Sequence, residues 1–223
     1  GASLKGANLR GAIMARAILA DADLSGADLA EANIGGVNAR RANFSGANLK
    51  EAKLSKGDFT EADFSGCELE GVESLEIVVK GALFAEAHIP NMRFIEADLT
   101  GARFPGADLN TALFYDCALE DVDFSRAVLT RCTWADVRLI NARFDEADMT
   151  AACFAATDPE KTTLRNVRFF RSRLDKCCFQ GVVMPGAILT EASMGNAVIN
   201  KADLSEADLS FAYARGAQFR KAR

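Results

Sequence analysis

Large apolar residues recur at every fifth position along the 223-residue chain. They begin at position 4 and end at 219, and these central positions hold Leu, Ile, Val, Met, Phe or Trp except at Ala39, Ser74, Pro159 and Ala214. A second inward position lies two residues before each centre and is most often Ala. A helix has a period of about 3.6 residues and a flat strand a period of about 2, so neither explains the pattern. The pattern predicts a chain that changes direction every five residues.

The same pattern predicts how the chain closes on itself. Four five-residue sides close a coil of twenty residues, so residues twenty apart should stack on successive coils. Sorting the centres by twenty puts six phenylalanines in one column: Phe44, Phe64, Phe84, Phe104, Phe124 and Phe144. A second column holds Phe94, Phe114, Trp134 and Phe154. We expect these columns to form stacked aromatic ladders in the core.

The individual repeats carry a family resemblance. They read Ala7-Asn8-Leu9-Arg10-Gly11 and Ala22-Asp23-Leu24-Ser25-Gly26, for example. This resembles the pentapeptide-repeat family, whose repeat is written A(D/N)LXX, and the resemblance covers the whole chain. It implies an all-β fold, a right-handed quadrilateral (square) β-helix solenoid, with about 11 coils of four pentapeptides for this length. We expect residues 1–223 to form one domain, which is part of a longer protein.

Two segments disturb the repeat. Residues 72–80 place Ser74 at a central position, and residues 155–163 place Pro159 at another. Proline has no backbone donor, and polar neighbours suit a surface loop. Both segments are candidates for irregular bulges. Because inserted residues would keep the five-residue phase, the columns beyond a bulge would be offset by one side of the coil.

Charge and hydropathy exclude some functions. The net charge of −5 argues against direct nucleic-acid binding, which needs a basic surface. No apolar run is long enough to span a bilayer, and no signal peptide opens the chain. We therefore expect no membrane span and a cytoplasmic location, or delivery from the cytoplasm without a cleavable signal.

The sequence holds few groups for catalysis. The single histidine, His88, lies at an outward position, so Ser-His-Asp, Cys-His and multi-histidine metal sites lack parts. Four of the six cysteines replace alanine at the small inward position: Cys67, Cys117, Cys132 and Cys177. Cys153 and Cys178 point outward, and this usage suits a reducing compartment. We expect no enzyme activity, no catalytic residues, no metal and no cofactor.

One outward column is acidic. Glu76, Glu96, Asp116 and Asp136 are spaced by twenty, and Asp98 lies close by. Like charges on neighbouring coils repel and contribute nothing to stability. We identify these five residues as a candidate acidic stripe for a protein partner. The alternative is a solvated face of a rod that is rich in acids everywhere.

The resemblance implies two candidate functions. The first is a non-catalytic structural or protein-interaction rod, a repeat domain of a larger bacterial protein such as a secreted effector or a secretion-system adaptor. The second is a DNA mimic, because some family members resemble B-DNA in shape and charge and protect DNA gyrase. Those members carry a C-terminal dimerisation element that this sequence does not show, which favours the first function. End-to-end or homodimer association is a further expectation for the exposed terminal coils.

Overall fold

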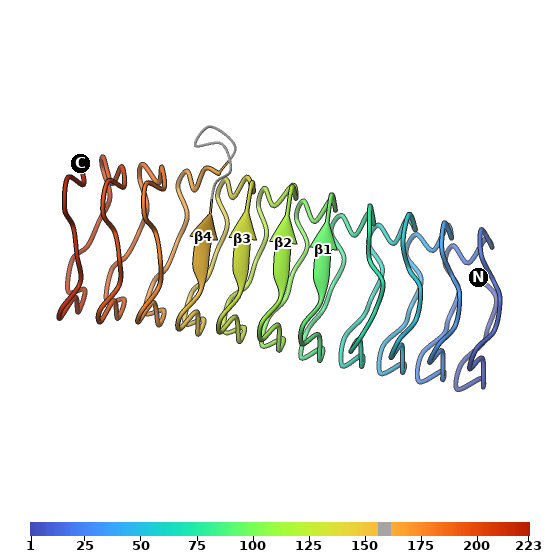
Figure 1. The fold of residues 1–223 in the computed structure, drawn as a ribbon. Helices are drawn as coiled ribbons and strands as arrows, with labels where there is room; N and C mark the ends of the chain where they lie inside the picture. The colour runs from blue at the N-terminus through green and yellow to red at the C-terminus, as the bar shows by residue number, and fades with distance from the viewer. Residues whose placement is uncertain (156–161) are drawn as a thin grey trace.

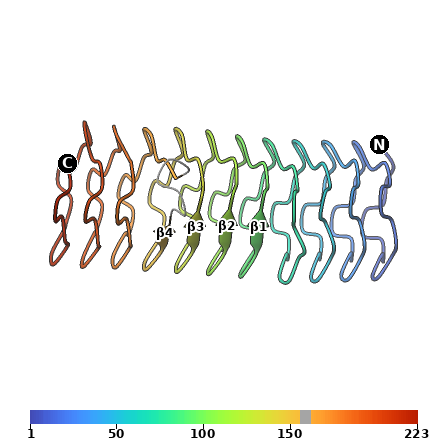
Figure 2. The same ribbon diagram turned by 45° about the horizontal axis from the view of Figure 1, so that its top comes forward.

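The computed structural model describes residues 1–155 and 162–223. In these residues the backbone winds in successive coils that stack side by side along one axis, with the two termini at opposite ends (Figure 1; Figure 2). The described residues form β-strands, β-bridges and turns. None of them belongs to a helix long and apolar enough to cross a membrane.

Successive coils are joined by parallel pairing. Ser3 pairs with Asp23, and bridges at the same step of twenty continue as far as Val128 and Asp148. Each twenty-residue turn of the chain carries four such bridge positions, one for each pentapeptide. The twenty-residue step predicted from the columns is therefore confirmed over this part of the chain.

A tight turn follows most central residues. At Phe59, for example, the carbonyl accepts a hydrogen bond of 3.0 Å from the N–H of Ala62. Glu61 lies between them with a φ of 59°, in the left-handed region that ordinary L-residues avoid. Its N–H donates to the carbonyl of Lys80 on the next coil at 2.7 Å. The hydrogen bonds between coils thus help to hold a non-glycine residue in an unfavourable backbone conformation.

The polar residue before each centre also has a structural role. Asp63 Oδ1 accepts hydrogen bonds from the backbone N–H of Ser65 at 2.9 Å and from its hydroxyl at 2.6 Å. Asp203 receives the same two bonds from Ser205. The hydroxyl of Ser205, followed by its N–H, holds the pKa of Asp203 below its ordinary value. The Asp or Asn of the repeat therefore satisfies a backbone donor at the corner that follows it.

Short strands form on one side of the stack. They are β1 (Arg93–Ile95), β2 (Leu113–Tyr115), β3 (Thr133–Ala135) and β4 (Cys153–Ala155), and they make a parallel sheet in the order β1-β2-β3-β4. The central residues of the strands pair in register and are buried: Phe94, Phe114, Trp134 and Phe154.

Two aromatic ladders fill the core. The rings of Phe44 and Phe64 lie 4.9 Å apart with 2° between their planes. The stacking continues through Phe84, Phe104, Phe124 and Phe144. The strand centres form the second ladder, and the two ladders meet edge to face, with Phe124 and Trp134 5.5 Å apart at 79°. Both predicted ladders are confirmed.

The pairing step changes within the segment 155–163. Cys153 pairs with Cys178 at a step of twenty-five residues, and the step returns to twenty where Thr163 pairs with Val183. The register gains five residues here, so each column continues one repeat later in the sequence. Pro159 itself lies outside the described residues.

The segment 72–80 keeps the step of twenty, as Leu75 pairs with Ile95. Ser74 occupies its central position and is only 4% exposed. Its hydroxyl donates a 2.7 Å hydrogen bond to the carbonyl of Arg93 on the next coil. A buried polar group is tolerated when it is hydrogen-bonded, which explains how a serine replaces an apolar centre at this coil.

Candidate functional site

The four acids spaced by twenty, called here the acid column, occupy equivalent corners of successive coils. They are Glu76, Glu96, Asp116 and Asp136, and their φ angles lie between 51° and 53°. The last three directly follow β1, β2 and β3. Neighbouring coils in a parallel sheet lie about 4.8 Å apart, so the acid column repeats at nearly that distance along the axis.

Hydrogen bonds between coils fix the backbone of the acid column. The N–H of Glu96 donates to the carbonyl of Tyr115 at 2.9 Å, and the N–H of Asp116 donates to that of Ala135 at 3.1 Å. The acids therefore cannot move apart along the axis to relieve repulsion without breaking these bonds. Their side chains can only turn outward or find a cation.

Cations balance the acids at one end of the site. Lys56 Nζ lies 3.6 Å from Glu76 Oε1, and Lys80 Nζ lies 2.9 Å from Asp98 Oδ2. Partial burial disfavours the charged form of Asp98, but hydrogen bonds from Lys80 and Thr100 outweigh it and hold the pKa of Asp98 below its ordinary value. These two acids are thus largely neutralised by the chain itself.

Glu96 and Asp116 differ from these two acids. Their side chains are exposed, as is that of Glu76, but neither of them forms an ion pair with a Lys or Arg of the described residues. Asp136 is only 4% exposed, so it does not present its charge in the same way. The exposed acids of the column that form no ion pair with a Lys or Arg of the described residues are therefore those on two neighbouring coils, Glu96 and Asp116.

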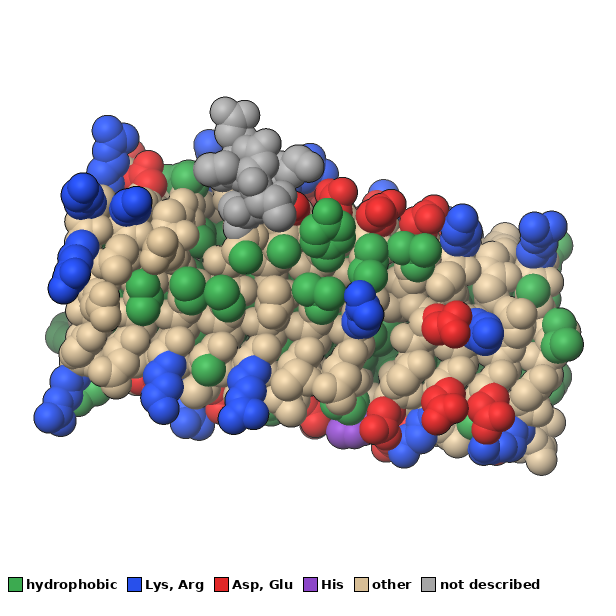
Figure 3. Space-filling model, viewed as in Figure 1, with side chains coloured by type: hydrophobic (Ala, Val, Ile, Leu, Met, Phe, Trp, Pro, Cys, Tyr) green, Lys and Arg blue, Asp and Glu red, His purple; other side chains and the backbone are tan. Residues whose placement is uncertain are grey.

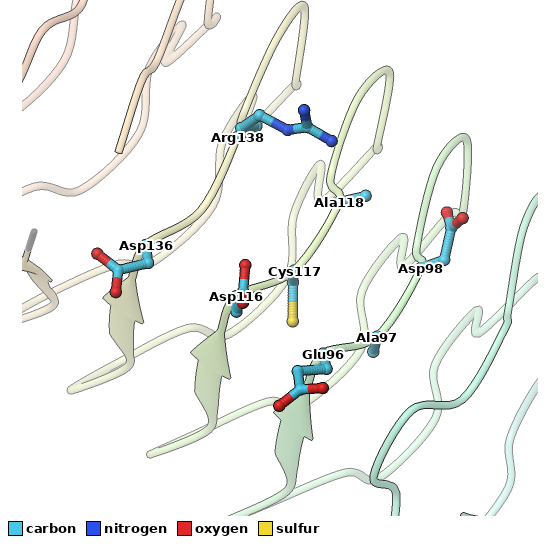
Figure 4. Close-up of a pocket in the computed structure, with 8 residues that line it drawn as sticks. All are labelled: Glu96, Ala97, Asp98, Asp116, Cys117, Ala118, Asp136 and Arg138. Atoms are coloured by element: carbon cyan, nitrogen blue, oxygen red, sulfur yellow. The ribbon is translucent and has the colours of Figure 1, made fainter. Parts of the chain in front are cut away.

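A shallow groove of about 470 Å³ runs beside the acid column. Figure 4 shows its lining, in which Glu96, Asp116 and Asp136 lie in a row at the ends of three strands. Ala118 lies between Asp98 and Arg138 on the next side of the coils. The small side chain of Ala118 leaves room there. Arg138 is engaged at its Nε by Glu120 Oε1, 3.3 Å away.

Apolar residues line the other flank of the acid column, which the sequence analysis did not identify. Leu75, Ile95, Tyr115 and Ala135 each precede one of the acids, and Leu75 and Tyr115 are 39% and 40% exposed. Figure 3 shows acidic side chains along the edge of a row of hydrophobic ones on this face. These apolar residues stand out in the sequence, because many equivalent positions in other columns hold Ser or Thr instead.

The other candidate chemical groups are dispersed. His88 Nδ1 lies 3.2 Å from Asp108 Oδ2 at the surface. In the described part of the chain, no three His, Cys, Asp or Glu residues are grouped so that they could hold a metal ion. The described residues thus place a row of acids with fixed backbone positions, a groove and an apolar flank on one face of the stack.

The repeat pattern and the parallel coils together define a repeat solenoid. The family model described as "Pentapeptide repeats (8 copies)" matches residues 2–40, 27–66, 80–116, 123–158 and 187–223. The chain therefore belongs to the pentapeptide-repeat family. No curated protein matches it.

Solved structures of pentapeptide-repeat proteins are similar to this chain. HetL, involved in heterocyst differentiation regulation in the cyanobacterium Nostoc sp. strain PCC 7120, is 26% identical over 96% of this chain and 87% of its own, with a TM-score of 0.39. QnrB1, a plasmid-mediated fluoroquinolone resistance protein, is 18% identical over 81% of this chain and 90% of its own, with a TM-score of 0.44.

Proposed function

We propose that this chain is a non-catalytic protein-interaction rod whose acid column and adjoining groove bind a basic segment of a partner protein. The observation that carries the proposal is the exposure of Glu96 and Asp116 on neighbouring coils without a cation of the described chain. Two like charges at this spacing repel by roughly 1 kcal/mol in water. A partner's Lys or Arg would remove that repulsion and gain an ion pair with each acid.

The charges around the site favour one end of the groove for the partner. Lys56 and Lys80 already neutralise Glu76 and Asp98, so the acids there offer little to a further cation. The apolar flank at Tyr115 lies beside the unneutralised pair. A partner segment with Lys or Arg beside an apolar side chain fits this combination, and charge complementarity would set its orientation.

Zero-length cross-linking tests the location directly. The full chain would be mixed with a decalysine peptide and a carbodiimide, which joins amines to carboxylates that they already contact. We expect the cross-links to concentrate at Glu96 and Asp116. Cross-links spread evenly over the exposed acids of all sides would contradict the proposal.

The proposal also covers the architecture of the rod and the kind of protein that contains it. We propose a right-handed quadrilateral coil of about 11 turns for this length, which the four bridge positions per twenty residues support. We also propose that it is a repeat domain of a larger bacterial protein of the effector or secretion-system adaptor type. The remainder of the open reading frame tests this setting, and a reading frame that encodes no other domain would contradict it.

The alternative is a DNA mimic that binds a topoisomerase such as gyrase. Its supporting observation is the regular row of acids along the axis, which offers negative charge at fixed intervals as a nucleic-acid backbone does. A gyrase supercoiling assay with the wild-type chain and a Glu96→Lys/Asp116→Lys variant tests it. Inhibition or protection by the wild-type chain that is lost in the variant would support this alternative over the first function.

A further inference from the structure

The change of pairing step brings two cysteines together. Cys153 and Cys178 are partners in a parallel bridge, with Thr133 on the coil before them and Val198 on the coil after. The two cysteines are twenty-five residues apart in the sequence. If the pairing step were twenty throughout, they would lie in different columns. They meet because the register gains five residues between them.

Backbone hydrogen bonds hold the two cysteines in register. The N–H of Cys178 donates to the carbonyl of Ala152 at 2.9 Å, and the N–H of Phe154 donates to the carbonyl of Cys178 at 2.9 Å. The Cys153 backbone is thus bracketed by bonds to its partner. Residues paired in register on adjacent strands direct their side chains to the same face, so both thiols lie on the outer face of the sheet.

The spacing suits a covalent link. Adjacent strands lie about 4.8 Å apart, and disulfides join residues whose Cα atoms are about 4.4–6.8 Å apart. Burial, followed by the charge and hydrogen bonding of Cys178, raises the pKa of Cys153 to about 11. The parallel bridge and its backbone hydrogen bonds place the two thiols side by side on adjacent coils.

Exposure separates this pair from the other cysteines. Cys67, Cys117, Cys132 and Cys177 are buried, whereas Cys153 and Cys178 are half-buried. Burial raises the pKa of each of the four buried thiols to about 12. A disulfide in solution cannot reach a buried thiol, whereas it can reach a half-buried one. The outer pair is therefore the accessible one.

We propose that Cys153 and Cys178 form a disulfide that links two adjacent coils when the chain meets a small-molecule disulfide such as oxidised glutathione. One thiolate attacks the oxidant, forms a mixed disulfide and releases one glutathione thiol. The second thiolate then attacks the sulfur of its neighbour, forms the Cys153–Cys178 bond and releases the second glutathione thiol. Two protons pass from the cysteines, and two electrons reduce the oxidant.

The disulfide would connect the chain on both sides of the register change. The closed loop runs from 153 to 178 and contains the segment 155–163. Since a cross-link restricts the unfolded chain, the oxidised protein should unfold at a higher temperature than the reduced protein.

The test uses the full native chain. It is incubated with oxidised glutathione at pH 8.5, the remaining thiols are alkylated, and the product is mapped by intact and peptide mass spectrometry. We expect the loss of two hydrogen atoms, a linked peptide pair that contains Cys153 and Cys178, and an increase in the unfolding temperature that dithiothreitol reverses.

Three variants provide the controls. Cys153→Ser and Cys178→Ser should each stop at the glutathione adduct of the remaining cysteine, and Cys67→Ala should still form the linked pair. A wild-type chain that accumulates only glutathione adducts, or that links a different pair of cysteines, would overturn the proposal. So would a wild-type chain that keeps both outer thiols free while they remain open to alkylation.

Discussion

Phe144 stacks on Phe169, twenty-five residues later, and not on a residue twenty positions along. The ring centroids lie 5.2 Å apart with 17° between the planes. Every earlier step of the same ladder spans twenty residues. The core therefore keeps the five-residue phase of the sequence even where the number of residues between stacked rings changes from twenty to twenty-five. The chain can gain a whole repeat without disturbing the packing on either side.

This tolerance predicts the effect of deletions. Removing residues 157–161 takes out one complete repeat and restores the step of twenty between Phe144 and the residue that stacks on it. We expect the deletion variant to keep its fold, with a thermal unfolding midpoint close to that of the wild type. Removing only 158–161 would shift every later residue by one position within the five-residue repeat. Outward residues would then occupy inward positions, so that variant should fail to fold beyond this point.

The aromatic ladders predict a large cost for a central truncation. Phe124 stacks on Phe104 and Phe144 and meets Phe114 and Trp134 edge to face. Phe124→Ala should lower the free energy of unfolding by about 3–5 kcal/mol because it leaves a cavity in both ladders.

Chemical denaturation followed by circular dichroism measures this loss. Phe170→Ala is the matched control, because Phe170 lies outside the core beneath the guanidinium groups of Arg168 and Arg171. That change should cost less than about 1 kcal/mol. Equal losses at the two positions would contradict the account of the core.

Trp134 should tolerate replacement by phenylalanine. Its side chain is fully buried, and its Nε1 has no hydrogen-bond partner among the described residues. A buried donor without a partner costs about 1–3 kcal/mol. Trp134→Phe removes that donor and keeps an aromatic ring in the ladder, so the loss of volume is partly offset. We expect a smaller destabilisation than for Phe124→Leu, measured by the same denaturation experiment.

Acid should weaken the fold through the carboxylates that receive hydrogen bonds at the corners. Burial disfavours ionisation of Asp58, but hydrogen bonds from Thr60 and Arg40 outweigh it and hold its pKa below the ordinary 3.8. A carboxyl with a lowered pKa in the folded state contributes stability that is complete above its unfolded pKa. That contribution is lost as the pH falls through the folded pKa. The unfolding free energy should therefore stay level from pH 5 to 8 and fall below about pH 4.

The matching measurement is a denaturation series across pH. Asp58→Asn should reduce the slope below pH 4, since it removes one of the groups that must be protonated. A variant that shows the same acid dependence as the wild type would contradict the assignment of this carboxylate.

The sequence predicts the core more completely than the surface. The two ladders follow from a period that only twenty-residue coils satisfy, and Pro159 marks the segment where the step changes. The pairing of Cys153 with Cys178 was not predicted, because the repeat pattern left open whether the offset of one side arises at 72–80, at 155–163 or at both. The burial of Asp136 and the pairing of Lys80 with Asp98 depend on side-chain positions that the period does not fix. The apolar flank at Leu75 and Tyr115 recurs at spacing twenty, so its position is predictable from the sequence.

A titration with paired variants shows whether Glu96 and Asp116 form the binding face. The affinity of a fluorescent decalysine peptide would be measured for the wild type, for Glu96→Gln/Asp116→Asn and for Glu86→Gln/Glu146→Gln. The control pair changes the net charge equally at exposed corners outside the acid column, where the φ angles are 54° and 60°. If they do, we expect a roughly two- to tenfold loss of affinity for the first variant and little change for the control. Equal losses in both variants, or no loss in either, would contradict a binding face at Glu96 and Asp116.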